Sequence, residues 1–181
     1  MNVLMPVANG SEEMEIVIVA DILRRVPWDV MIAGLGAGAI RASRSVRLVP
    51  DAAWADVTTE AFDMLVIPGG SDGVKALAKD ERLLATARTF MANGKWVAAI
   101  CAGPLVLQAA GVLKGRRVTC HPGVAGELTQ TPRRNDRVVV DGRLITSQAP
   151  GTAFEFALAL IRAVEGDAKA NKLAKSMVVN A

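Results

Sequence analysis

The sequence has 181 residues, of which 51% are hydrophobic and 22% are charged, a balance typical of a folded globular domain and too apolar for a disordered chain. Lys and Arg outnumber Asp and Glu by only 21 to 18, which gives a net charge of +3. Because the basic residues are largely scattered along the chain, this charge argues against a dedicated nucleic-acid-binding protein.

No apolar run reaches the roughly 18 to 20 residues that span a bilayer, and residues 1–16 lack the basic-then-apolar order of a secretory signal. We therefore expect a soluble, cytoplasmic protein with no membrane partner. The two cysteines, Cys101 and Cys120, form no disulfide framework and fit free thiols in a reducing compartment. A single histidine, His121, beside so few cysteines argues against structural zinc, and we expect neither a metal nor another cofactor.

Short strand-like segments alternate with longer helical ones along the chain. Hydrophobic patterns and turn residues predict strands, in chain order, at 2–8, 28–35, 62–70, 95–100 and 116–122. Helices are predicted at 12–26, 80–94, 104–113, 152–166 and 168–179. The remaining segments read as a polar excursion or hairpin of two short strands at 39–51, and a strand pair with an Asp-Gly turn at 137–147.

The strands at 64–67 and 96–100 are apolar on both faces, as a parallel sheet covered by helices on each side requires. Repeated strand–helix alternation then predicts an α/β fold with an open, doubly wound, mostly parallel sheet and one small hairpin excursion. No linker, internal repeat or low-complexity segment divides the chain, so we expect a single domain over 1–181.

Three predicted strands end in residues that could carry chemistry: Pro68-Gly69-Gly70, Cys101-Ala102-Gly103-Pro104 and Cys120-His121-Pro122. In an open α/β sheet, ligands bind at the carboxyl ends of the strands, so these three segments are expected to converge on one site. Each of them also has a purely structural interpretation.

Cys101 lies in a sharp turn between a strand and a helix, because Pro104 marks the first helical position three residues later. Unpaired amides and the positive end of the helix dipole favour thiolate over thiol at such a place. This is the arrangement of a nucleophile elbow. The alternative is an inert core cysteine that packs as a small hydrophobe.

Gly69 and Gly70 could bring their amides close to an oxyanion, although a glycine pair after a strand is also an ordinary tight turn. His121 is the only imidazole that could act as an acid or base, although a lone histidine is more often structural. Successive strand residues point to opposite faces, so Cys120 should face away from Cys101 if His121 faces toward it.

Glu15 shares a helix face with the apolar residues Ile18, Val19 and Ile22. If that face points to the core, burial raises the pKa of the carboxyl, which could then stay protonated near neutrality and relay a proton. The alternative for Glu15, as for Glu12 and Glu13, is an ordinary acidic residue in the first turn of a helix.

The segments GSEEME, LVIPGG, AAICAGP, VTCHP and ITSQAPGTAFEFAL together resemble the ThiJ/PfpI superfamily, in particular its DJ-one branch, which contains the parkinsonism-associated deglycase. The resemblance covers nearly the whole chain and implies a flavodoxin-like fold and a homodimer. It implies Cys101 as nucleophile, Glu15 as its protonated hydrogen-bond partner and His121 as a nearby acid or base. The further residues that it implies are an oxyanion site at Gly69, Gly70 and Ala102, and anion-binding arginines at the dimer seam, Arg25 and the partner subunit's Arg44.

The resemblance also orders the candidate functions. The peptidase branch of the superfamily has a histidine directly after the cysteine, and Ala102 at that position removes the base that a cysteine peptidase needs. The function implied first is therefore a cofactor-independent glyoxalase or deglycase acting on methylglyoxal, glyoxal or their early adducts, with nucleic acid relevant only as a glycated substrate. An oxidation-sensing redox chaperone with a sulfinate at Cys101 is the alternative.

Overall fold

The computed structural model describes residues 1–179 and contains a seven-stranded sheet with the strand order β5-β2-β1-β6-β7-β9-β8. All neighbouring strands are parallel except β8, which pairs antiparallel with β9. The strands are β1 (Asn2–Val7), β2 (Asp29–Gly34), β5 (Ala52–Ala53), β6 (Met64–Ile67), β7 (Trp96–Ile100), β8 (Val138–Asp141) and β9 (Leu144–Ser147). The predicted α/β fold with a mostly parallel sheet is confirmed.

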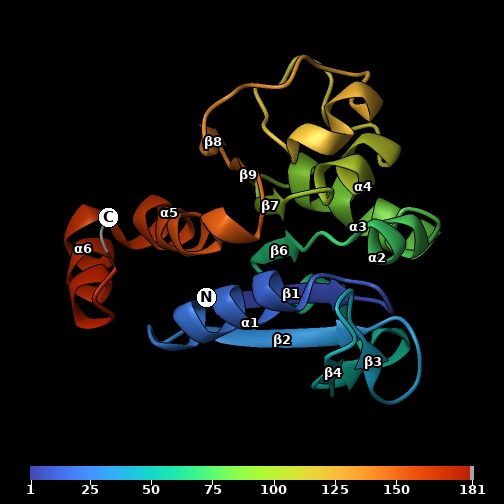
Figure 1. Cartoon of the computed structure of the whole chain (residues 1–181), viewed down its shortest axis with the longest axis horizontal. Helices are drawn as coiled ribbons and strands as arrows, with labels where there is room; N and C mark the ends of the chain where they lie inside the picture. Colours follow the sequence, from blue (N-terminus) through green and yellow to red (C-terminus); the bar gives the residue numbers. More distant parts are fainter. Residues whose placement is uncertain (180–181) are drawn as a thin grey trace.

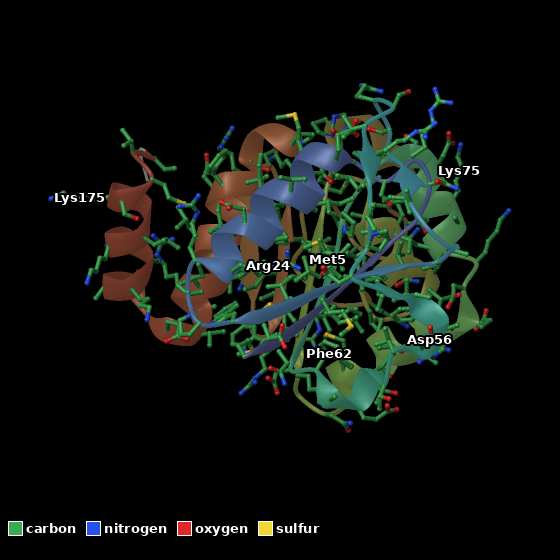
Figure 2. All side chains as sticks on the ribbon, turned by 90° about the horizontal axis from the view of Figure 1, so that it is seen from below. Met5, Arg24, Asp56, Phe62, Lys75 and Lys175 are labelled. Atoms are coloured by element: carbon green, nitrogen blue, oxygen red, sulfur yellow. The ribbon has the colours of Figure 1, made fainter. Side chains whose placement is uncertain are left out.

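Helices cover both faces of the sheet (Figure 1). The helices are α1 (Glu13–Arg24), α2 (Ser71–Leu77), α3 (Glu81–Ala92), α4 (Pro104–Ala109), α5 (Ala153–Glu165) and α6 (Asp167–Ser176). Apolar residues of α1 and α5 pack with one face of the strands, those of α2, α3 and α4 pack with the other, and α6 packs against α5. Met5 lies in the interior, whereas Lys75 of α2 and Lys175 of α6 lie at opposite ends of the view in Figure 2.

The predicted hairpin at 39–51 is confirmed as the antiparallel pair β3 (Ile40–Arg41) and β4 (Arg47–Leu48). The predicted strand at 116–122 is wrong, because only an isolated bridge joins Val118 to Arg133. The amide of Thr119 donates to the side-chain Oγ1 of Thr146 at 2.9 Å, and this bond to a side chain takes the place of a strand ladder.

Helix α2 was not predicted, since its seven residues include a glycine and show no complete apolar stripe. Asp80 separates it from α3, because the Asp80 carboxylate accepts from the amide of Leu83 at 2.7 Å and caps the second helix. Helix α4 ends four residues earlier than predicted, before Gly111, which has a left-handed φ of 77°. Among residues 1–179, no helix is both long and apolar enough to cross a membrane.

Candidate active site

Cys101 sits directly after β7, in the turn that leads into α4. Its φ of 64° is left-handed, which is unfavourable for a residue with a Cβ. Two backbone hydrogen bonds hold it there: its amide donates to the carbonyl of Ser147 at 3.0 Å, and its carbonyl accepts from the amide of His121 at 2.9 Å. The side chain is half-buried, so the sulfur can be reached from the pocket described below.

The backbone amides of Gly70 and Ala102 lie beside the Cys101 sulfur and act to lower the pKa of its thiol. Gly69 lies against the same side chain so closely that a Cβ at Gly69 would stand 2.5 Å from the Cys101 Cβ and 2.9 Å from its Sγ. Only glycine fits at position 69 without displacing the cysteine. Two of the three expected oxyanion amides therefore lie beside the sulfur, whereas the amide of Gly69 has a different partner.

That partner is Glu15, whose Oε2 accepts from the Gly69 amide at 2.6 Å. The residue is 0% exposed, and its other oxygen, Oε1, has no hydrogen-bond partner among residues 1–179. Burial raises the pKa of Glu15 to about 7, although the hydrogen bonds with Gly69 and Cys101 act in the opposite direction, and the nearby charge of Glu12 raises it further. A buried carboxyl that holds its proton to near neutrality thus lies against the thiol.

Glu15 in turn affects the pKa of the Cys101 thiol. Burial, the negative charge of an ionised Glu15 and the hydrogen bond to that carboxylate raise the pKa of the Cys101 thiol to about 12, against the opposite effect of the Ala102 and Gly70 amides. The expectation that the turn alone would favour thiolate is corrected here. When Glu15 carries the proton, its charge disappears and it donates to the sulfur, so the two groups share one proton.

Cys101 and His121 face a pocket of about 740 Å³. The His121 Nδ1 accepts from the amide of Gly123 at 3.0 Å, which leaves Nε2 as the ring nitrogen free for a ligand. Arg44 lines the same pocket within its own chain, and the contribution of the partner subunit's Arg44 that the resemblance implies stays a prediction. Arg25 does not line it and instead pairs with Asp21 on the surface of α1 at 2.7 Å.

Several pocket residues were missed in the sequence because they come from the hairpin. The amide of Gly10 donates to the carbonyl of Arg41 at 2.8 Å, which brings β3 against the loop after β1. The hydroxyl of Ser43 contacts the carboxylates of Glu12 and Glu13, at 2.9 Å for the latter. No pattern in the sequence signals that the hairpin folds back on the start of α1.

Cys120 is 0% exposed and packs with the α2–α3–α4 side of the sheet, whereas Cys101 packs with the α1–α5 side. No group of three or more His, Cys, Asp or Glu side chains within residues 1–179 could hold a metal ion. Both cysteines are free thiols. Cys101 and Cys120 therefore lie on opposite sides of the sheet, although the strand alternation from which this was expected is absent at 116–122.

The chain is similar to known proteins over most of its length. The family model described as "DJ-1/PfpI family" matches residues 1–163. The chain is 40% identical over 179 residues to "Protein dj-1beta" of Drosophila melanogaster, covering 97% of this chain and 96% of the relative. It is 38% identical to "Glutathione-independent glyoxalase DJR-1.2" of Caenorhabditis elegans, covering 97% and 94%.

One further relative is much longer than this chain, and another has a solved structure. The chain is 40% identical to "Protein DJ-1 homolog B" of Arabidopsis thaliana but spans only 41% of that protein. The solved structure titled "Toxoplasma gondii DJ-1, oxidized" superposes with a TM-score of 0.94 at 36% identity, covering 99% of both chains. The family match over most of the sequence and the near-complete coverage of several relatives lead to one conclusion: the chain belongs to the DJ-1/PfpI family.

Proposed function

We propose that this protein is a cofactor-independent glyoxalase or deglycase with Cys101 as its nucleophile. The observation that carries the proposal is the fully buried Glu15 carboxyl, which lies with the Cys101 side chain against Gly69, while Cys101 is held in a left-handed turn. A nucleophile with its own acid–base partner is the minimum that this chemistry needs. The relative from C. elegans that is named a glyoxalase supports the same reaction class.

The first step uses the shared proton. With the proton on Glu15, the Cys101 thiolate adds to the aldehyde carbon of methylglyoxal and forms a C–S bond. The electron pair of the carbonyl moves to its oxygen, which the amides of Gly70 and Ala102 are placed to stabilise and which then takes the proton from Glu15. The product is a neutral hemithioacetal, and Glu15 is left as a carboxylate.

The second step moves hydrogen between the two carbons. The Glu15 carboxylate removes the proton from the former aldehyde carbon and returns it to the neighbouring ketone carbon, while the hydroxyl proton passes to the ketone oxygen, where His121 can assist. The first carbon is oxidised to a thioester and the second is reduced to an alcohol. Water then cleaves the C–S bond, which releases lactate and restores Cys101 and Glu15 with their one shared proton.

The pocket also has room for larger substrates. At about 740 Å³ it exceeds the size of a free two- or three-carbon aldehyde, and Arg41 and Arg44 line it together with Cys101. This space supports early adducts of the aldehydes with amines or thiols as substrates, including adducts of proteins and nucleotides. The free thiols fit action in the cytoplasm, where a reducing environment preserves Cys101.

The test is lactate formation by metal-free protein. After treatment with chelator, the protein is incubated with methylglyoxal in the absence of added thiol, and lactate is quantified by chiral chromatography. We expect catalytic turnover and one dominant enantiomer, because both proton transfers occur inside a chiral site. Lactate no faster than in buffer, or a racemic product at the buffer rate, would refute the glyoxalase proposal.

An oxidation sensor or redox chaperone is the second candidate, and the same geometry supports it. A sulfinate at Cys101 would accept from the amides of Gly70 and Ala102 and from a protonated Glu15. The solved structure of the Toxoplasma gondii relative is described as oxidized. This reading needs a reactive cysteine but no transfer of protons between substrate carbons.

Graded peroxide is expected to oxidise Cys101 to a sulfinate before it changes Cys120. Cys101 opens to the pocket, whereas Cys120 is 0% exposed, so peroxide reaches the Cys101 sulfur first. Peptide mass spectrometry at increasing peroxide concentration provides the measurement. Oxidation of Cys120 first would refute this order of reactivity.

We also propose a homodimer. Met14 and Val17, one turn apart on α1, are 51% and 50% exposed, and Phe154 at the start of α5 is 42% exposed. Helices α1 and α5 pack together, so these apolar side chains belong to one side of the molecule, where a second copy could cover them. Light scattering that gives the mass of one chain would refute the dimer.

A further inference from the structure

Strand β9 ends beside Cys101 in two polar residues, Thr146 and Ser147, that are both 0% exposed. Thr152, shortly before α5, is 3% exposed. Buried hydroxyls in a native structure require hydrogen-bond partners, and those partners show what the hydroxyls hold in place.

The Ser147 hydroxyl connects two parts of the chain. Its Oγ lies 2.8 Å from the carbonyl oxygen of Arg137, just before β8, and 2.6 Å from the Oγ1 of Thr152. The Thr152 Oγ1 also lies 2.8 Å from the carbonyl oxygen of Ala149, so two hydroxyl protons serve three contacts, and either hydroxyl can be the donor between Ser147 and Thr152. The Thr152 Oγ1 in turn accepts from the amide of Ala149 at 3.1 Å. Ser147 is thereby fixed from both sides.

Ser147 also forms a backbone hydrogen bond with the nucleophile, Cys101. The Ser147 carbonyl accepts the amide of Cys101 at 3.0 Å, one residue beyond the last paired position of β7. The other backbone bond of Cys101 comes from His121, whose segment is held where Thr119 donates to Thr146. A left-handed residue with a Cβ persists only when the surrounding structure fixes it, and both fixing bonds lead to the end of β9.

We propose that Ser147 and Thr152 are positioning residues, whose paired hydroxyls fix the end of β9 and so hold Cys101 in its left-handed conformation. The proposal rests on the proposed function only in that Cys101 is the nucleophile. Without the pair, the end of β9 keeps its backbone pairing with β8 but loses its side-chain bonds to the Arg137 carbonyl and to Thr152 at the start of α5. Cys101 then relaxes, and its sulfur moves away from the Gly70 and Ala102 amides.

The test compares variants that remove or keep the hydroxyl pair. Ser147→Ala and Thr152→Val remove one member each, whereas Thr152→Ser keeps the hydroxyl. Thr152→Val also removes the two bonds between its hydroxyl and Ala149, which Ser147→Ala keeps, but it removes no cap of α5, because the Thr152 side chain makes no capping hydrogen bond to that helix. Thr86→Val is the matched control, since Thr86 is 6% exposed and its hydroxyl donates to the carbonyl of Arg82 at 2.8 Å on α3.

The readout is the pH profile of Cys101 alkylation by iodoacetamide, followed by peptide mass spectrometry, which requires no turnover. In Ser147→Ala and Thr152→Val the Gly70 and Ala102 amides act less on the sulfur, so its thiolate forms at higher pH. Because the pKa of the thiol already lies at about 12, the profile is compared below that value, where an upward shift of the midpoint by about one pH unit appears as about tenfold slower alkylation at a fixed pH. Thr152→Ser and Thr86→Val should keep the original midpoint.

Unchanged midpoints in both Ser147→Ala and Thr152→Val would overturn the proposal, and so would an equal shift in Thr86→Val. If Thr152→Val does not fold, Ser147→Ala alone decides, with the same criterion. Where the unmodified protein forms lactate, kcat should fall in the two variants with KM nearly unchanged. A shifted midpoint in a protein that forms no lactate would refute the proposed function and leave the positioning role intact.

Discussion

Replacement of Cys101 by alanine is expected to reduce lactate formation to the rate in buffer, a loss of about a thousandfold or more for a missing nucleophile. The C–S bond cannot form without the sulfur, and the Gly70 and Ala102 amides then have no adduct to stabilise. The fold should persist, because alanine removes one partly exposed atom from the turn. The measurement is the metal-free lactate assay, with circular dichroism as the check on folding.

Cys120→Ala is the matched control for the loss of a thiol. It removes a sulfur that packs on the other side of the sheet, so we expect most of the activity to remain and stability to fall by about 1 kcal/mol. An equal loss of activity in both variants would mean that the nucleophile has been wrongly assigned. A fully active Cys101→Ala protein would refute covalent catalysis altogether.

The layers of the fold could be predicted because they depend on local patterns. Strands that are apolar on both faces, such as 64–67 and 96–100, fit only a covered parallel sheet. The segment at 116–122 was misassigned because β propensity describes a half-buried pleated surface and cannot show that the Thr119 amide bonds to the Thr146 hydroxyl. That bond depends on tertiary packing, which no local pattern records.

Some features of the candidate site likewise follow from the local sequence, and others depend on tertiary packing. The turn at Cys101 and the apolar face around Glu15 follow from nearby residues, since Pro104 starts a helix and the spacing of Val19 and Ile22 sets the face. The protonation of Cys101 does not follow, because it depends on burial and on a carboxyl from a different element. The place of Arg44 depends on how the hairpin folds against α1, which the sequence does not reveal.

Glu15→Gln is expected to lower the turnover number by about a hundredfold or more while Cys101 remains able to form a sulfinate. The glutamine amide can donate to the sulfur and its oxygen can accept from Gly69, but it cannot take a proton from carbon and return it. The measurements are lactate formation and peptide oxidation on the same preparation. Near-normal turnover would remove Glu15 from the mechanism and leave His121 as the proton carrier.

The pH dependence of stability provides the folding control for this variant. Burial raises the pKa of Glu15 from 4.5 to about 7, so between these pH values the folded chain holds a proton that the unfolded chain has lost. The free energy of unfolding contributed by Glu15 therefore falls as the pH rises through this window and levels off above about pH 7. Glutamine has no charge to bury, so the stability of Glu15→Gln relative to the unmodified protein should increase from pH 4.5 to 7, measured by urea unfolding. A constant difference across this range would mean that Glu15 is ionised throughout it and cannot supply the proton in the first step.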